Sequence, residues 1–159
     1  MKTLFVSHIR PILEFASPVW NMNYVGDTKI LESVQRSWTK QIDGLCDVPY
    51  NLRLEYLQLY SVRGRMLRAD LVTCWRVLHG HCPELQHIFH QPIYSRTRGH
   101  SMRLFQTRAS SEPRHRFFTM RVVPLWNSLS EAAVSCDSIS SFKKALHREL
   151  YSQLHNYYE

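Results

Sequence analysis

Residues 61–78 read Ser61-Val-Arg-Gly-Arg-Met-Leu-Arg-Ala-Asp-Leu-Val-Thr-Cys-Trp-Arg-Val-Leu78, and they predict a helix with two distinct faces. One face carries the apolar stripe Leu67, Leu71, Cys74, Trp75 and Leu78. The arginines Arg65, Arg68 and Arg76 fall on a separate face. Gly64 weakens the first turn by about 1 kcal/mol relative to alanine, and Gly80 is well placed as a C-terminal cap. Core and charge are therefore separated within one helix.

Helical spacing extends from this stretch toward the N-terminus. A first helix is expected to carry the stripe Phe5, Ile9, Ile12 and Ala16 and to end at Ser17-Pro18. Asp27 is placed to cap a second helix, which Gly44 stops. The predicted apolar face of this second helix is Leu31, Val34, Trp38 and Ile42. A shorter helix is expected over about residues 51–57.

Helical spacing weakens after Pro83 and returns near residue 118. A short turn around residues 85–89 precedes Pro92, which opens a stretch with no sustained period. The next helix is expected to bury Phe118, Val122, Leu125, Trp126 and Leu129, with a kink or break at Pro124. The last helix, capped by Asp137 or Ser138, is expected to bury Ile139, Phe142, Leu146 and Leu150. We expect the tail after Tyr151 to fray.

Composition supports a packed helical protein. The chain has 159 residues, of which 44% are apolar and 21% are charged, and these values fit one ordinary folded domain. Only 5 Gly and 7 Pro are present, with no Asn-Gly or Asp-Gly hairpin signal, which favours helices over sheet. The prediction is an all-α fold, an irregular bundle of about five to six helices with an Arg-rich loop. Residues 1–159 are expected to form a single helical unit.

The cysteines and the N-terminus favour an intracellular location. Cys46, Cys74, Cys82 and Cys136 show no C-x-x-C spacing, so reduced thiols are expected. His8 and Arg10 interrupt the N-terminal apolar run before it resembles a signal peptide. No run approaches the ~18 apolar residues of a membrane span. We expect a cytoplasmic or nuclear protein that is not secreted and has no membrane partner.

Basic charge is concentrated in arginines. The net charge is +7, and seven arginines lie between Arg96 and Arg121 against a single acid, Glu112. Arginine bonds phosphate in a bidentate manner and stacks on bases, so this concentration favours a polyanionic partner. On composition alone, a solvated basic face is an equally good interpretation. The candidate nucleic-acid contacts are Arg65, Arg68, Arg76, Arg96, Arg98, Arg103, Arg108, Arg114, Arg116 and Arg121.

The basic loop, residues 94–116, is the functional candidate with the best physical support. Aromatic residues are interleaved with the arginines in and just after it: Tyr94, Phe105, Phe117 and Phe118. Such mixtures grip phosphates and stack exposed bases. Phe118 also lies on a predicted core face, which favours packing for that ring.

Signals for catalysis, metal or cofactor binding are weak. Donors crowd one stretch, His79, His81, Cys82, His87 and His90, but their spacing matches no closed zinc site. We find no Gly-x-Ser-x-Gly, no P-loop and no dinucleotide glycine fingerprint. The thirteen acids include no adjacent Asp-Asp pair for two-metal phosphoryl transfer. We therefore expect a non-enzymatic protein without metal or cofactor.

Several motifs occur in a shared order over about 140 residues. They are His8-Ile-Arg-Pro-Ile-Leu-Glu-Phe15, Ser17-Pro-Val-Trp20, Leu31-Glu-Ser-Val-Gln-Arg36, Arg68-Ala-Asp-Leu71, Gly80, Arg96-Thr-Arg-Gly-His-Ser101, Phe117-Phe-Thr-Met-Arg-Val-Val123, Leu125-Trp-Asn-Ser-Leu129 and Ser141-Phe-Lys-Lys144. In this order the chain resembles the region after the polymerase core of LINE-type (non-LTR, jockey-like) retrotransposon reverse transcriptases. It departs from that pattern at Ser130, where proline is usual, and at Pro124, where it is not.

The resemblance implies a role in holding nucleic acid. Residues 1–80 are similar to thumb helices that brace a primer–template duplex, and residues 81–159 look like the C-terminal extension. The Tyr-x-Asp-Asp turn of the catalytic palm is absent here. RNA or an RNA–DNA hybrid is the implied partner, together with a palm on the same or another polypeptide. Arg96, Arg98 and Arg121 fall inside the family-like motifs and are the best contact candidates.

Two other interpretations stay open. In the first, the chain is a structural or protein-interaction remnant of a decayed or domesticated element, and its arginines only keep it soluble. Alternatively, it is a polymerase subunit that another chain completes. The sequence does not indicate the oligomeric state.

Overall fold

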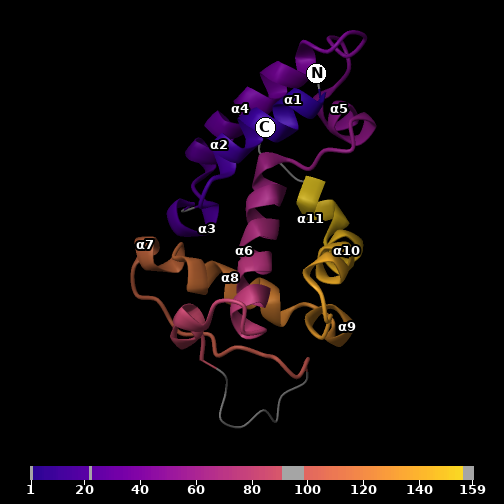
Figure 1. The fold of residues 1–159 in the computed structure, drawn as a ribbon. Helices are drawn as coiled ribbons and strands as arrows, with labels where there is room; N and C mark the ends of the chain where they lie inside the picture. Colours follow the sequence, from indigo (N-terminus) through magenta and orange to yellow (C-terminus); the bar gives the residue numbers. More distant parts are fainter. Residues whose placement is uncertain (1, 22, 91–98, 156–159) are drawn as a thin grey trace. The chain divides into compact units, whose positions relative to one another are not determined.

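The computed structural model describes residues 2–21, 23–90 and 99–155, and every regular element in these ranges is helical (Figure 1). The all-α prediction is thereby confirmed. The helical segments are more numerous than the five to six predicted, because both ends of the chain form short pieces. The α-helices are α1 (Lys2–Leu4), α2 (Arg10–Glu14), α3 (Ser17–Trp20), α4 (Val25–Lys40), α5 (Tyr50–Tyr56), α6 (Val62–Leu78), α7 (Glu112–His115), α8 (Phe118–Asn127), α9 (Glu131–Val134), α10 (Ile139–Glu149) and α11 (Tyr151–His155). A π-helical segment, η1 (Phe5–Ile9), joins α1 to α2, and a 3₁₀ helix, η2 (Pro83–Ile88), follows α6.

The chain divides into two compact units. The first unit comprises residues 1–67 together with 152–159, and the second comprises residues 68–151. Because α6 is continuous from Val62 to Leu78, one helix supplies residues to both units.

Helix α6 confirms part of the predicted apolar stripe, because Leu67 and Leu78 are only half-buried. Leu71, Cys74 and Trp75 are at most 1% exposed. The helix ends at Leu78, and Gly80 follows with a φ of +77°, in the left-handed region that glycine adopts without strain. The amide of His81 donates to the Arg76 carbonyl over 2.8 Å, which completes the predicted C-terminal cap.

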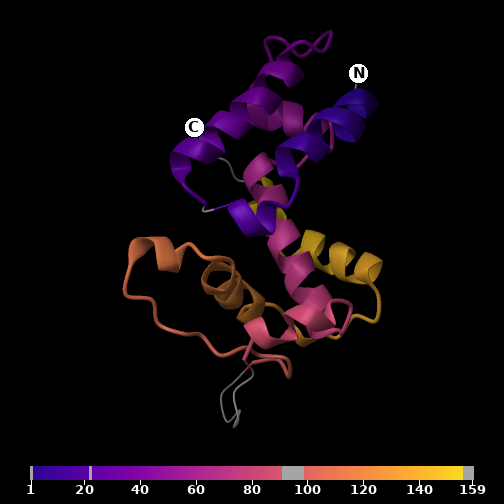
Figure 2. The ribbon, with the colours of Figure 1, turned by 60° about the vertical axis from the view of Figure 1, so that its left-hand side comes forward.

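The first unit pairs the N-terminal helices with α4 in antiparallel fashion (Figures 1 and 2). The Phe5 ring stacks on Trp38 with centroids 4.2 Å apart, and Arg10 donates to the Gln35 side chain over 3.4 Å. Both predicted apolar stripes are only partly confirmed in this unit, where Phe5 is buried and Trp38 and Ile42 pack against the apolar core. In the first stripe only Phe5 is buried, while Ile9, Ile12 and Ala16 are exposed and Arg10 is buried instead.

Helix α4 buries polar side chains in place of the predicted apolar face. Its fully buried residues are Thr28, Glu32, Gln35 and Thr39. Val34 is exposed, and Leu31, Trp38 and Ile42 are only half-buried. Asp27 does not cap the helix either, because α4 begins two residues earlier, with Tyr24 at the cap position. Asp27 lies instead in the first turn, where its negative charge interacts favourably with the helix dipole.

The buried polar side chains of α4 are satisfied by partners in the same unit. Glu32 accepts hydrogen bonds from the Tyr50 hydroxyl and from the Val62 amide, the latter over 2.9 Å. Gln35 donates to the Tyr50 hydroxyl and to the Tyr60 carbonyl. Burial raises the pKa of Glu32 and of Tyr50. Burial, with the charge of Arg65, lowers the pKa of Arg10 to about 10. The contacts of Glu32 and Gln35 make their burial tolerable, because they replace hydrogen bonds lost from water.

The C-terminal tail folds back as a helix, so the prediction of fraying after Tyr151 is wrong for residues 151–155. Leu154 is fully buried, and its carbonyl accepts from the Ser61 amide over 3.2 Å and from the Ser61 hydroxyl over 3.3 Å. Gly64 makes this approach possible. A Cβ placed on Gly64 would lie 2.0 Å from the Leu154 carbonyl oxygen.

The second unit has the aromatic and aliphatic core that the sequence predicts. Trp126, Phe142 and Leu146 are fully buried, and Phe142 stacks on Trp75 with centroids 5.9 Å apart. Ser138 caps α10, as predicted, by accepting from the Ser141 amide over 3.2 Å. Helix α8 continues through Pro124 to Asn127. Within the described ranges, no helix has the length and apolar character to cross a membrane.

Candidate nucleic-acid interface

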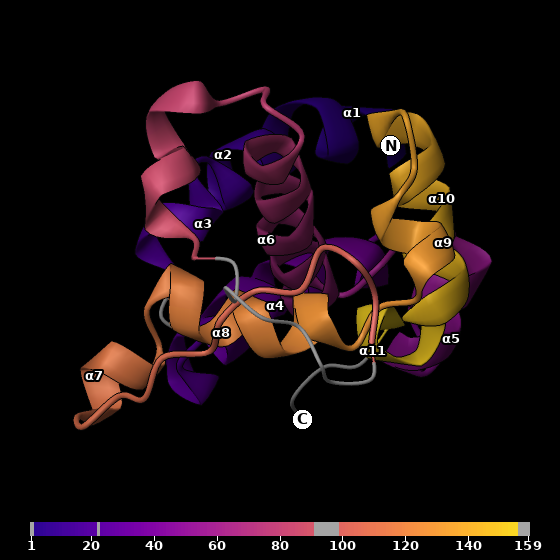
Figure 3. The same cartoon turned by 90° about the horizontal axis from the view of Figure 1, so that it is seen from below.

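An extended segment, residues 99–111, crosses the second unit alongside α8 (Figure 3). Two side chains of α8 hold it. The Trp126 indole donates to the Met102 carbonyl over 2.8 Å. The Asn127 side chain exchanges two 2.9 Å hydrogen bonds with the backbone of Leu104. The segment is therefore positioned by side chains of a buried helix.

Two further contacts hold this segment. The Phe105 amide donates to the His90 carbonyl over 2.7 Å. Glu131, at the start of α9, accepts from the amide and hydroxyl of Ser101, and these hydrogen bonds lower the pKa of Glu131. Sequence analysis missed the tethering roles of Trp126 and Asn127. Their signal was the Leu125-Trp-Asn-Ser-Leu129 motif, in which a polar Asn interrupts an apolar stripe.

Exposed rings accompany exposed arginines in this part of the chain. Phe105 is 57% exposed and Phe117 is 48% exposed. The Arg114 guanidinium lies over the Phe117 ring, 5.3 Å from its centroid, within the range of a cation–π contact. Phe118 is half-buried and packs on Phe89, so packing is the better interpretation of that ring, as the sequence indicates.

A hollow of about 440 Å³ lies between the extended segment and the α7–α8 region. It is lined by Gln106, Thr107, Arg108, Ala109, His115 and Met120. Within this lining, the Thr107 hydroxyl donates to the Met120 sulfur. The hollow thus places the exposed Arg108 among hydrogen-bonding and ring side chains.

The predicted arginine contacts fall into distinct groups. Arg76, Arg108 and Arg114 are exposed, and Arg68 and Arg103 are half-buried. Arg116 is also half-buried and forms an ion pair with Glu112. Arg65 belongs to the first unit and pairs with Glu14. Arg96 and Arg98 lie outside the described residues.

Arg121, one of the leading predicted contacts, is largely buried in an ion pair within the second unit. Its guanidinium forms two hydrogen bonds to Asp70, 2.7 and 3.0 Å long. The two side chains are only 10% and 5% exposed. Burial raises the pKa of the Asp70 carboxyl, while the Arg121 charge acts in the opposite direction. Arg121 therefore joins α8 to α6 within the second unit.

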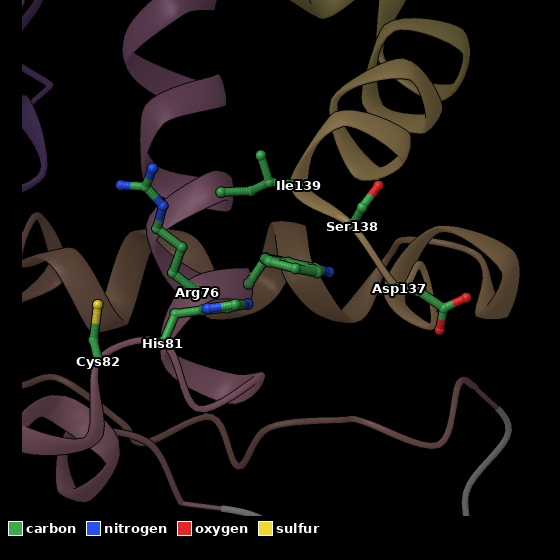
Figure 4. A pocket seen from close by; sticks show the side chains of 7 residues that line it. Arg76, His81, Cys82, Asp137, Ser138 and Ile139 are labelled. Atoms are coloured by element: carbon green, nitrogen blue, oxygen red, sulfur yellow. The ribbon is translucent and has the colours of Figure 1, made fainter.

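Arg76 lines a second hollow, of about 540 Å³ (Figure 4). Figure 4 shows Arg76 and His81 on one side, with Asp137 and Ser138 on the segment that leads into α10. The Asp137 carboxylate opposes anion binding here, and the Ser138 hydroxyl already caps α10. This hollow therefore adds less to a phosphate-binding surface than the one beside Arg108.

Two of the clustered histidines pack as rings. His79 and His81 both stack on Trp75, with centroids 4.1 and 5.3 Å away. Among the described residues, no three His, Cys, Asp or Glu side chains are grouped to hold a metal ion. The four cysteines carry free thiols, and burial raises the pKa of Cys74 well above its usual value.

No family model, curated protein or solved structure matches the chain. A functional assignment therefore depends on the geometry of the second unit and on the motifs in the sequence.

Proposed function

We propose that the chain is a non-catalytic nucleic-acid-binding protein that holds RNA or an RNA–DNA hybrid through the Arg-rich surface of its second unit. The observation that carries the proposal is the Arg114 guanidinium over the half-exposed Phe117 ring, beside the hollow that contains Arg108. A ring of this kind offers a stacking surface to any base, and neighbouring guanidinium groups bond the phosphates.

The motifs in the sequence are consistent with this proposal. They resemble the thumb and post-polymerase region of a LINE-type reverse transcriptase, whose duplex is bound mainly through its backbone and shape. Binding is accordingly expected to depend little on sequence. The protein would bind the primer–template duplex while another polypeptide, or a palm joined to this chain, supplied the chemistry.

Fluorescence anisotropy with the full chain tests the proposal, using labelled single-stranded RNA and an RNA–DNA hybrid of the same sequence. Phe117→Leu keeps an apolar side chain but removes the stacking ring, and we expect about a 5- to 100-fold weaker affinity. Arg114→Ala is expected to weaken binding to every sequence by a similar factor. Arg148→Ala, which removes an exposed arginine of α10, is the matched control.

Two results would contradict the proposed interface. If neither nucleic acid binds at low salt, or if Phe117→Leu and Arg114→Ala bind as well as Arg148→Ala, the interface is not at this surface. Combined substitution of Arg96, Arg98 and Arg103 by Ala then tests the rest of the basic loop. Unchanged binding in that variant favours the remnant interpretation.

A further inference from the structure

Four positions in the sequence place a serine or threonine hydroxyl three residues after an arginine. They are Thr39 after Arg36, Ser101 after Arg98, Ser111 after Arg108 and Thr119 after Arg116. Arginine-directed serine/threonine kinases recognise this spacing, because acidic side chains beside their active site bind the preceding guanidinium. The structure distinguishes the four positions by the accessibility of each hydroxyl.

Three of these hydroxyls are poorly placed for modification. Thr39 is fully buried, and its hydroxyl donates to the Arg36 carbonyl over 3.0 Å. The Ser101 hydroxyl donates to Glu131 over 2.6 Å. Thr119 is half-buried and lies within α8. Since an enzyme must reach both the side chain and the backbone around it, loops are better substrates than such positions.

Ser111 differs from the other three positions in each of these respects. It is exposed, and its backbone is extended, with φ −129° and ψ 150°. Its hydroxyl makes no capping hydrogen bond to α7, the helix that begins at the next residue. The extended segment that carries the exposed Arg108 leads to α7 at the edge of the second unit (Figure 3). Ser111 and the preceding arginine are therefore accessible together.

We propose that Ser111 is a phosphorylation site for an arginine-directed kinase, and that its phosphate weakens nucleic-acid binding at Arg108 and Arg114. In the reaction, the Ser111 hydroxyl oxygen bonds to the γ-phosphorus of ATP, the bond between that phosphorus and ADP breaks, and a base of the kinase takes the hydroxyl proton. The new group carries a charge of about −1.5 to −2 at pH 7. The site itself is independent of the proposed function, whereas the effect on binding rests on it.

The residues after Ser111 offer its phosphate a cationic partner. Arg114 follows three residues later, and the His115 amide donates to the Ser111 carbonyl over 3.1 Å, so these residues form one helical turn. Side chains three residues apart on such a turn are neighbours. A phosphate–guanidinium bond is charge-assisted and stronger than an exposed cation–π contact, such as that of Arg114 with Phe117. The phosphate would therefore bind Arg114 and cancel positive charge that the surface offers to RNA.

Incubation of the full chain with ATP and a calmodulin-dependent protein kinase, which selects arginine three residues before the serine, tests the site. Tandem mass spectrometry is expected to locate the phosphate on Ser111. Arg108→Ala is expected to slow incorporation about 10- to 100-fold, because the kinase loses a charge-assisted contact. Ser110→Ala and Arg148→Ala are the matched controls, and we expect an unchanged rate at Ser111 in both.

Fluorescence anisotropy with labelled single-stranded RNA tests the effect of the phosphate. The phosphorylated chain is expected to bind on the order of tenfold more weakly than the unmodified chain, with a log–log salt slope less steep by about one to two, because the phosphate neutralises up to two guanidinium groups. Kinase-treated Ser111→Ala is the control and is expected to bind RNA as the unmodified chain does.

The two assays fail separately. A chain that takes up no phosphate on Ser111, or incorporation that Arg108→Ala leaves unchanged, overturns the site. Phosphate on Ser111 with unaltered RNA affinity overturns the effect on binding. If the unmodified chain binds no RNA, the proposed function fails and the effect on binding fails with it, while mass spectrometry still decides the site.

Discussion

Removing one side chain of the Asp70–Arg121 ion pair is expected to destabilise the folded protein. Arg121→Leu would leave the Asp70 carboxylate buried without its bidentate partner. We expect a loss of about 3–5 kcal/mol of unfolding free energy at pH 8. Urea denaturation measures it. Arg116→Ala is the control, because Arg116 forms an i,i+4 pair with an exposed Glu112, worth about 0.3–0.5 kcal/mol.

The same variant makes a prediction about pH. Burial raises the pKa of Asp70, and loss of the Arg121 charge would raise it further. Between the ordinary pKa of aspartate and this raised value, the folded state binds a proton that the unfolded chain does not, so stability falls as pH rises. We therefore expect the Arg121→Leu deficit to shrink when the pH is lowered from 8 to about 5. A deficit that stays constant or grows would contradict a buried ionised Asp70.

Individual polar residues explain where sequence analysis succeeded and failed. The Ser138 cap and the left-handed Gly80 depend on local backbone chemistry, which neighbouring residues determine. The burial of Glu32 and Gln35 depends on Tyr50, Tyr60 and Val62, which are 15 to 30 positions away. Arg10 depends in turn on Gln35, which is 25 positions away. The spacing of apolar residues along the sequence gives no information about these hydrogen-bond partners. For the same reason, the sequence does not distinguish the ion-paired Arg121 from an arginine that is exposed at the surface.

Helix α6 and helix α11 meet at a glycine, and this contact can be tested against another helical glycine. Gly64→Ala would place a Cβ against the Leu154 backbone. We expect a destabilisation of about 1–3 kcal/mol despite the better helix propensity of alanine. Gly26→Ala in α4, where nothing lies within 4 Å of the added Cβ, is expected to stabilise the protein by about 0.5–1 kcal/mol. Equal effects at the two positions would show that α11 does not dock on α6.

The lengths and ends of the long helices follow from local signals, whereas their orientation does not. Residues 61–78 and 51–57 were predicted to within about a residue at each end. In α4, the apolar set Leu31, Val34, Trp38 and Ile42 competes with a polar set at the same helical spacing. Both sets satisfy a period of 3.6, so the choice between them depends on the neighbours that cover each face. The tertiary structure, and not the spacing of residues in the sequence, gives that information.

Charge is distributed unequally between the two units. Residues 68–151 contain twelve Lys or Arg against six Asp or Glu, a net charge of +6, whereas the first unit contains eight against seven, a net charge of +1. If six phosphates are neutralised, the log–log slope of affinity against salt is about −4 to −5. We expect Arg108→Ala to make this slope less steep by about one, and Lys40→Ala of the first unit to leave it unchanged. A slope near zero for the unmodified chain would exclude binding through phosphates.

The docking of Leu154 on Ser61 has a consequence for biosynthesis. These partners are 93 positions apart, and α11 completes a unit whose other residues are made first. At ordinary elongation rates the ribosome needs about 5–20 s to travel that distance. During this interval the N-terminal helices of the nascent chain lack their contact with α11. A chaperone that binds exposed apolar segments would have the most time to bind them then.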